Sequence, residues 1–287
     1  MRTLINIVLV CVSSNFSNVF AKDIDTTKVP IQDVYRLTSQ ARTTELRKMK
    51  DIPLQPLWDL TGHLDTPYAI ALFAGRGEKE AQLISYYSEY PDEFKEFSAT
   101  GQFITHNFKW RKLIYTKLHT LHGGKHKAVN KRRNAIRNAI KESLNNSNEI
   151  WKTGILIHAL GDSYAHTKGK YNSPEERAFN KYTGHGIESI FLTDPDAIFK
   201  KENEEKYIAF ITDLFNLLET KNKDQVGFNS FVNDFRSANC NSNECILNKT
   251  ILNFVHGKAL NSQKNLNATL TPLTKAQVVE ALNMIKD

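Results

Sequence analysis

Three side chains able to bind a metal ion stand four residues apart in the stretch Ile155–His166. They are His158, Asp162 and His166, and most residues around them are apolar. In an α-helix each step of four residues advances about 400°, so the three side chains fall on one face within about 80°. Imidazole and carboxylate are good ligands for zinc, manganese or iron, and burying them without partners is costly. The spacing therefore predicts a metal site on a helix face.

The rest of the chain predicts helices and few strands. Apolar residues at i, i+3, i+4 and i+7 from Tyr207 to Leu218 are typical of a core helix. The chain shows no internal repeat and no long linker. We therefore expect an all-α protein with one multi-helix bundle domain at 56–287, a lead segment at 22–55, and a polar, less regular part from about residue 222. The expected helices cover 68–75, 78–90 (stopped by Pro91), 103–121, 127–144, 149–166 and 207–218, with shorter ones near 228–236 and 275–286.

The first residues predict export from the cytoplasm. Arg2 precedes a short apolar run, and Val19 and Ala21 fit the −3 and −1 positions of a cleavage site before Lys22. That run is too short to cross a bilayer comfortably, and no later stretch approaches the ~20 apolar residues of a transmembrane helix. We expect a signal peptide at 1–21, a secreted or periplasmic protein, and no transmembrane segment.

Cys240 and Cys245 are the cysteines that remain after the predicted cleavage. Their spacing suits a local disulfide in an oxidising compartment. The alternative is a metal-binding pair, but the chain has no second pair of cysteines to complete a thiolate zinc site.

The formal net charge is +7, and much of the excess lies between Lys125 and Arg137. This stretch predicts a helix with a narrow apolar stripe and a basic face. The simplest interpretation is a solvated helix face. The alternative is contact of residues 125–141 with an anionic membrane surface, or with nucleic acid. Charge alone does not distinguish these polyanions.

Other side chains that could complete the metal site stand near the ends of predicted helices and turns. Each also has an ordinary explanation: His63 as a residue near a helix start, Asp92 as a turn residue after Pro91, and one of His119 and His122 as structural. We expect His106, His126 and His256 not to bind metal. The candidates are His63, Asp92, His119 or His122, His185 and Glu188.

The order of these pieces resembles the all-helical superfamily of zinc-dependent phospholipases C and single-strand-specific zinc nucleases, above all its exported bacterial members without an assigned substrate. The resemblance covers about residues 56–220, and its specific part is the central motif. The similar features are the run His63–Gly75, the turn Tyr90-Pro91-Asp92, the pair Leu118-His119, the motif His158–His166, Gly184-His185 and Asp194-Pro195-Asp196.

The resemblance implies a cluster of two or three zinc ions, or other divalent metals, at one end of a helical bundle. Asp162 would be the bridging carboxylate, with His158, His119 and Asp92 on one side. A second metal would be bound by His166, His185 and Glu188, and a third by His63 with Asp162. Clustered cations lower the pKa of bound water and neutralise charge that develops on phosphorus. Asp92 would alternatively orient or deprotonate that water.

Two features depart from the family pattern. The family often has His-x-x-x-Glu where this chain has His185 and Glu188 three residues apart, with Gly186 between them. The best-known members also bind one zinc through an N-terminal tryptophan, whereas the predicted cleavage leaves Lys22 at the N-terminus. Trp58 would take that part only after a further proteolytic cut.

The favoured hypothesis is an exported, phospholipase C-like metal-dependent hydrolase of phosphoric esters, in which Asp92 and Asp162 are catalytic. Its substrate would be a phospholipid or another phosphodiester. One alternative is a zinc-dependent nuclease, for which Tyr164, Tyr171 and Phe179 are available to stack on bases. Another is a non-catalytic exported binding protein that keeps a structural metal site.

Overall fold

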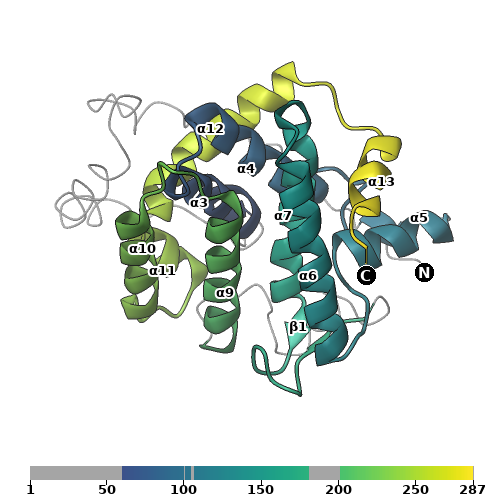
Figure 1. Cartoon of the computed structure of the whole chain (residues 1–287), viewed down its shortest axis with the longest axis horizontal. Coiled ribbons are helices and arrows are strands. Elements are labelled where there is room, and N and C mark those ends of the chain that lie inside the picture. Colours follow the sequence, from purple (N-terminus) through teal and green to yellow (C-terminus); the bar gives the residue numbers. More distant parts are fainter. Residues whose placement is uncertain (1–59, 100, 105–106, 181–200, 287) are drawn as a thin grey trace, which may run out of the picture.

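The computed structural model describes residues 60–99, 101–104, 107–180 and 201–286. The predicted signal peptide, the lead segment, Trp58, His185 and Glu188 lie outside these ranges. The described part is mostly helical, with one two-stranded sheet, which confirms the all-α class (Figure 1). Among the described residues, no helix combines the length and apolar character needed to cross a membrane.

The elements follow one another along the chain with short connections. The N-terminal part contains the π-helix η2 (Thr61–Asp65), α3 (Thr66–Phe73), α4 (Glu78–Glu93), the 3-10 helix η3 (Gly101–Ile104), α5 (Phe108–Leu113) and the π-helix η4 (Ile114–Leu118). The central part contains α6 (His126–Ser143), the 3-10 helix η5 (Ser147–Glu149), α7 (Ile150–Ala165), β1 (Thr167–Lys168) and β2 (Arg177–Ala178). The C-terminal part contains α9 (Lys201–Leu218), α10 (Gln225–Ser237), α11 (Asn243–Lys249), α12 (Leu252–Thr269) and α13 (Lys275–Asn283).

Helix α7, which carries the central motif, is the core of the bundle. Every residue from Lys152 to Ala165 is buried, and the helix packs against α4, α6, α9 and α13. Figure 1 shows α7 beside α6, with α9 on one side and α13 on the other. Gly154 allows α4 to approach closely, because a Cβ there would lie 2.3 Å from the Cβ of Tyr87. This packing fixes α7 relative to the helices that supply the other site residues.

The strands β1 and β2 form an antiparallel hairpin that follows the motif directly. Thr167 pairs with Ala178, and Lys168 pairs with Arg177. Gly169 takes a positive φ of 87°, a conformation that glycine adopts readily. The hairpin folds the chain back against α6, which contacts β2.

We expected helix α4 to stop at Pro91, but it continues to Glu93. Proline lacks an N–H, so the helix loses the hydrogen bond that residue 91 would have donated to the carbonyl of Tyr87. Pro91 lies in the last turn, where the helix is about to end, and buried tyrosines at 86, 87 and 90 hold that turn in the core. Asp92 consequently lies on a helix and not in a turn.

The segment expected as one helix at 103–121 is divided into η3, α5 and η4. The part from about residue 222, expected to be less regular, contains four helices, α10 to α13. Of these, the sequence did not predict α11 and α12. Cys240, in the connection after α10, and Cys245, in α11, form the predicted disulfide, with an S–S distance of 2.06 Å.

Candidate metal centre

Helix α7 places two of the predicted ligands in contact. His158 and Asp162 are buried one turn apart, and His158 Nε2 lies 3.4 Å from Asp162 Oδ2. His166 follows immediately after the helix as its C-cap residue, with Nδ1 3.5 Å from the same oxygen. The four-residue spacing therefore brings all three side chains to one end of α7.

His63 reaches the same carboxylate from the π-helix η2. Its Nε2 lies 3.0 Å from Asp162 Oδ1, and its ring centroid lies 4.2 Å from that of His158. Gly161 makes room for this ring, because a Cβ there would lie 3.0 Å from His63 Cε1. A π-helix is rare and often marks a functional site.

His119 stands at the end of the second π-helix, η4. Its backbone N–H donates to the carbonyl of Ile114, five residues earlier, at 2.9 Å. Its Nδ1 lies 2.9 Å from Asp162 Oδ2 and 3.3 Å from His158 Nε2. Each π-helix of the described chain thus brings a histidine to Asp162.

Asp92, in the last turn of α4, forms the open side of the site. Its Oδ1 lies 4.0 Å from His119 Nδ1, and its side chain is 28% exposed while the histidines and Asp162 are buried. Two overlapping groups result, each with ligand atoms within 4.8 Å of one another: His63, His158 and Asp162, and Asp92, His119 and His158.

Backbone carbonyls determine which nitrogen of three histidines faces the site. His158 Nδ1–H donates to the carbonyl of Ser88 at 2.8 Å, and His119 Nε2–H donates to that of Phe97 at 2.9 Å. His166 Nδ1–H donates to the carbonyl of His119 at 2.8 Å. Such outer bonds are typical of metal-binding histidines, because they fix the tautomer and the ring orientation. His158 Nε2 and His119 Nδ1 are thereby left as the atoms with lone pairs toward Asp162.

These contacts shift the protonation of the site. Burial and the charge of His63 lower the pKa of His158. Burial alone would lower the pKa of His119 too, but the hydrogen bond and charge of Asp162, with the charge of Asp92, raise it. Burial alone would raise the pKa of Asp162, yet the charges of His166 and His158, with the hydrogen bonds from His119 and His158, hold it well below the usual range. The site therefore holds an ionised carboxylate that attracts positive charge.

The structure brings one of the two candidates His119 and His122 to Asp162. His119 lies against Asp162, whereas His122 Nδ1 accepts a hydrogen bond from Gly124 N at 3.0 Å. His166 belongs to neither three-residue group, and its Nδ1 donates to the carbonyl of His119. Its expected partners His185 and Glu188 lie outside the described residues. His126 and His256 lie elsewhere: His126 contacts Asn130, and His256 contacts Asp65.

A buried ion pair that the sequence did not reveal supports this end of α7. Arg133 on α6 donates to both carboxylate oxygens of Glu176, at 2.7 and 3.2 Å, and its Nε and Nη2 donate to the carbonyl of Ser163. Glu176 also accepts from Thr167 Oγ1 and from the backbone N–H of Asn172. The pair thus joins α6, the end of α7 and the β1–β2 connection.

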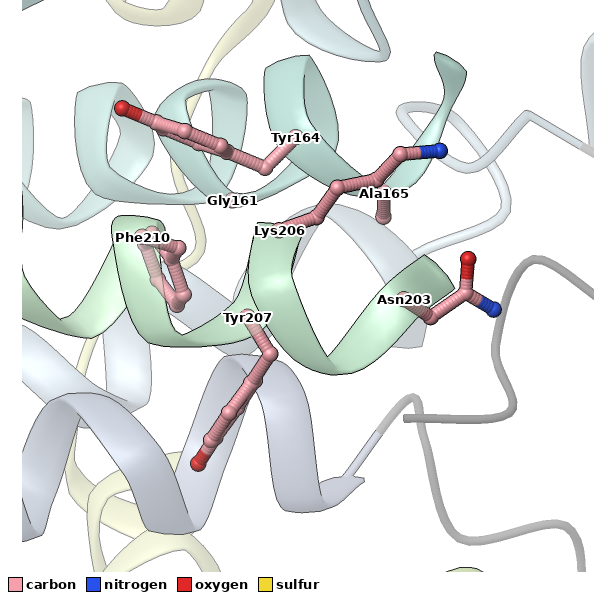
Figure 2. Close-up of a pocket in the computed structure, with 7 residues that line it drawn as sticks. All are labelled: Gly161, Tyr164, Ala165, Asn203, Lys206, Tyr207 and Phe210. Carbon is pink, nitrogen blue, oxygen red and sulfur yellow. The ribbon is translucent and has the colours of Figure 1, made fainter. Parts of the chain in front are cut away.

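A small pocket lies between α7 and α9, lined by Gly161, Tyr164 and Ala165 of α7 and by Asn203, Lys206, Tyr207 and Phe210 of α9 (Figure 2). The space in it that the centre of a water molecule can reach is about 10 Å³, roughly enough for one water. Small-molecule sites usually begin near ~300 Å³. Lys206 Nζ also donates to the carbonyl of Thr167. We assign no substrate to this pocket.

The chain was compared with known proteins at the levels of family, sequence and structure. No family model, no curated protein and no solved structure matches it.

Proposed function

We propose that the chain is an exported metal-dependent hydrolase of phosphoric esters, similar in chemistry to phospholipase C. The metal, zinc or another divalent ion, would be bound by His63, Asp92, His119, His158 and Asp162. Histidine nitrogen together with carboxylate oxygen is a typical ligand set for zinc. The disulfide supports an oxidising compartment.

One observation carries the proposal. His119 Nδ1 and His158 Nε2 lie 3.3 Å apart beside an ionised carboxylate, and the other nitrogen of each ring already donates to a carbonyl. Two lone pairs facing one another are unfavourable unless a cation stands between them or near both. In the metal-free protein an extra proton on His119 takes the place of that cation, which agrees with the raised pKa of His119. A divalent ion satisfies all of these donors together.

The arrangement favours catalysis over a purely structural role. Structural zinc sites are usually closed by four protein ligands, whereas catalytic sites keep an open position. Here Asp92 is partly exposed and leaves the site open on its side. A bound divalent ion supplies a Lewis acid for a phosphoryl oxygen and lowers the pKa of water. As an alternative to binding the metal, Asp92 would accept a proton from that water, and Asp162 would hold the histidines in place.

The test is metal content together with hydrolysis. The purified protein is stripped with a chelator and reloaded with zinc. Its metal is counted by mass spectrometry, and turnover is assayed on a chromogenic phosphodiester, phosphatidylcholine and single-stranded DNA. We expect two or three zinc ions per chain and hydrolysis that requires them. Asp162→Asn should lose both, whereas Asp213→Asn, which removes a carboxylate paired with Arg137 outside the site, should keep both.

Each alternative predicts a different result. One tightly bound metal without turnover would support a structural site in a binding protein. Turnover of single-stranded DNA alone would support the nuclease. Full hydrolysis by Asp162→Asn with its fold intact by circular dichroism would contradict the proposal.

A further inference from the structure

Positive charge is concentrated in one continuous part of the sequence. No aspartate or glutamate stands between Glu96 and Glu142, although the whole chain contains 31 acidic residues. The same stretch contains the basic residues Lys109, Arg111, Lys112, Lys117, Lys125, Lys127, Lys131, Arg132, Arg133, Arg137 and Lys141.

Contacts within the protein engage the arginines of α6, so its basic face is weaker than the sequence indicated. Arg133 is buried against Glu176, and Arg137 pairs with Asp213. Arg132 donates to the carbonyl of Thr116 and is buried. What α6 exposes is a set of separate lysines, which is compatible with a solvated helix face.

Helix α5 presents a different surface. Phe108, in its first turn, is 71% exposed, and Lys109 and Lys112 are also exposed. The guanidinium of Arg111 lies over the Phe108 ring, 4.9 Å from its centroid. Val226 is the other large hydrophobic side chain exposed among the described residues, and the one basic residue within three positions of it, Lys223, is paired with Glu219. Only at α5, within the described chain, does an exposed aromatic ring stand among cations.

The opposite side of α5 is firmly held. Asn107 caps the helix by accepting from Trp110 N at 3.0 Å, and Trp110 Nε1 donates to the carbonyl of Glu96 at 3.2 Å. The Glu96 carboxylate is itself paired with Lys275 at 2.8 Å, which reduces its effect on the positive surface. Trp110 is buried and packs edge-on against Phe97. The exposed ring is therefore displayed by a fixed helix at the edge of the molecule (Figure 1).

We propose that α5 is a membrane-contact element that binds the surface of an anionic bilayer. Phe108 enters the interface, while Lys109, Arg111 and Lys112 contact lipid phosphates. Interfacial segments typically combine an inserted aromatic with flanking lysine and arginine, whose long side chains reach the head groups. Binding of single-stranded nucleic acid would instead require several stacking rings along a groove. The single exposed ring at α5 favours the bilayer.

This surface is directly connected to the candidate metal centre. Helix α5 continues into η4, which is followed directly by His119, and Trp110 packs on Phe97, whose carbonyl orients the His119 ring. Binding at α5 would hold the metal centre near the lipid surface. The proposal does not depend on the proposed function, because a protein without activity would still bind.

The test is co-sedimentation of the full chain with vesicles of phosphatidylcholine alone and of phosphatidylcholine with phosphatidylserine. We expect binding to the anionic vesicles that weakens in high salt. Phe108→Ala should lower the partition coefficient about tenfold, since it removes the apolar contact. Lys109→Gln and Lys112→Gln should each lower it about fivefold, and only on anionic vesicles.

The controls are Val226→Ala and Lys221→Gln, which alter an exposed apolar residue and an exposed lysine elsewhere. Both should bind like the unchanged protein, and so should Asp162→Asn, which separates membrane binding from activity. Equal losses for Phe108→Ala and Val226→Ala would overturn the proposal. So would the absence of binding to anionic vesicles, or binding of single-stranded DNA that needs the lysines but not Phe108.

Discussion

At the scale of single residues, Asp162 organises the candidate site. Its two oxygens lie 3.0 Å from His63 Nε2 and 2.9 Å from His119 Nδ1, with His158 and His166 slightly farther away. A carboxylate surrounded in this way stays ionised although it is buried. Removing its charge while keeping its shape is therefore the most informative single change in the site.

Gly161 should control the metal affinity of His63 without touching a metal. A methyl group at this position would come within 3.0 Å of His63 Cε1, so Gly161→Ala should turn the ring away from Asp162. We expect zinc affinity at this position to fall about ten- to a hundredfold, as for other losses of ligand orientation. Titration calorimetry of the stripped protein measures it.

Gly257→Ala is the matched control for this change. Gly257 also lies in a helix, α12, but a Cβ there would meet nothing within 4 Å. Both substitutions gain helix propensity of about 1 kcal/mol. Only Gly161→Ala should weaken zinc binding, and equal affinities in the two variants would show that His63 tolerates the displacement.

His256 and Asp65 should make stability depend on pH. His256 Nδ1–H donates to the buried Asp65 Oδ2 at 2.8 Å. Burial alone would lower the pKa of His256, but Asp65 raises it above the usual range. The stabilisation from a raised histidine pKa is complete below the unfolded value of about 6.5 and is lost as pH rises through the folded value. His256→Ala should therefore cost more stability at pH 6 than at pH 9.

Urea unfolding of both proteins at the two pH values checks this difference. Its size should be on the order of 1 kcal/mol, the margin between a charged and a neutral hydrogen bond. A cost that is the same at pH 6 and pH 9 would mean that the charge of His256 contributes nothing to stability.

At the scale of elements, the two π-helices explain what the sequence could and could not predict. The spacing of His158 and Asp162 predicted that they share one helix face, because α-helical periodicity fixes it, and in the structure the two side chains are in contact. His63 and His119 were named as candidates, but their approach depends on the wider turns of η2 and η4. A π-helix has no clear sequence signal. The sequence also does not show which backbone carbonyl, such as that of Ser88, will accept a hydrogen bond from a histidine ring. The outer bonds of the histidines could therefore not be predicted from residue types.

The same limit applies to the ion pair of Arg133 and Glu176. In the sequence Arg133 is one of several basic residues on a helix, and only the packing shows that it is buried. Removing one member of a buried pair leaves the other charge unpaired and costs about 3–5 kcal/mol. We expect Arg133→Met to lower the free energy of unfolding by this amount, and Arg133→Met with Glu176→Leu to recover much of it. Urea denaturation measures both.

Lys223 and Glu219 provide the control for this comparison. They form an exposed i,i+4 pair at 2.6 Å, so Lys223→Met should cost less than about 1 kcal/mol. If Arg133→Met cost as little stability as Lys223→Met, then the buried pair of Arg133 and Glu176 would not support the end of α7.

At the scale of the whole molecule, the candidate site joins segments that are distant in sequence. His63 and Asp162 are 99 residues apart, and His119 and Asp162 are 43 apart. A metal bound by these side chains ties η2, η4, α4 and α7 to one point. Because the unfolded chain offers no such arrangement, the free energy of metal binding adds to the stability of the fold.

Removing the metal should therefore lower the melting temperature reversibly. A ligand at 100 times its dissociation constant stabilises the folded state by about 2.7 kcal/mol. For a chain of this size, 1 kcal/mol corresponds to about 2–4 °C, so a chelator should lower the melting temperature by about 5–10 °C and zinc should restore it. Differential scanning calorimetry measures both steps.

Asp162→Asn distinguishes the site from weak binding of zinc elsewhere on the surface. This variant keeps the shape of the side chain but removes the charge that the four histidines surround, so chelator and zinc should leave its melting temperature unchanged. Asp213→Asn should respond like the unchanged protein. An equal response in all three proteins would mean that the stabilising metal binds away from Asp162. The proposed ligand set around that carboxylate would then be wrong.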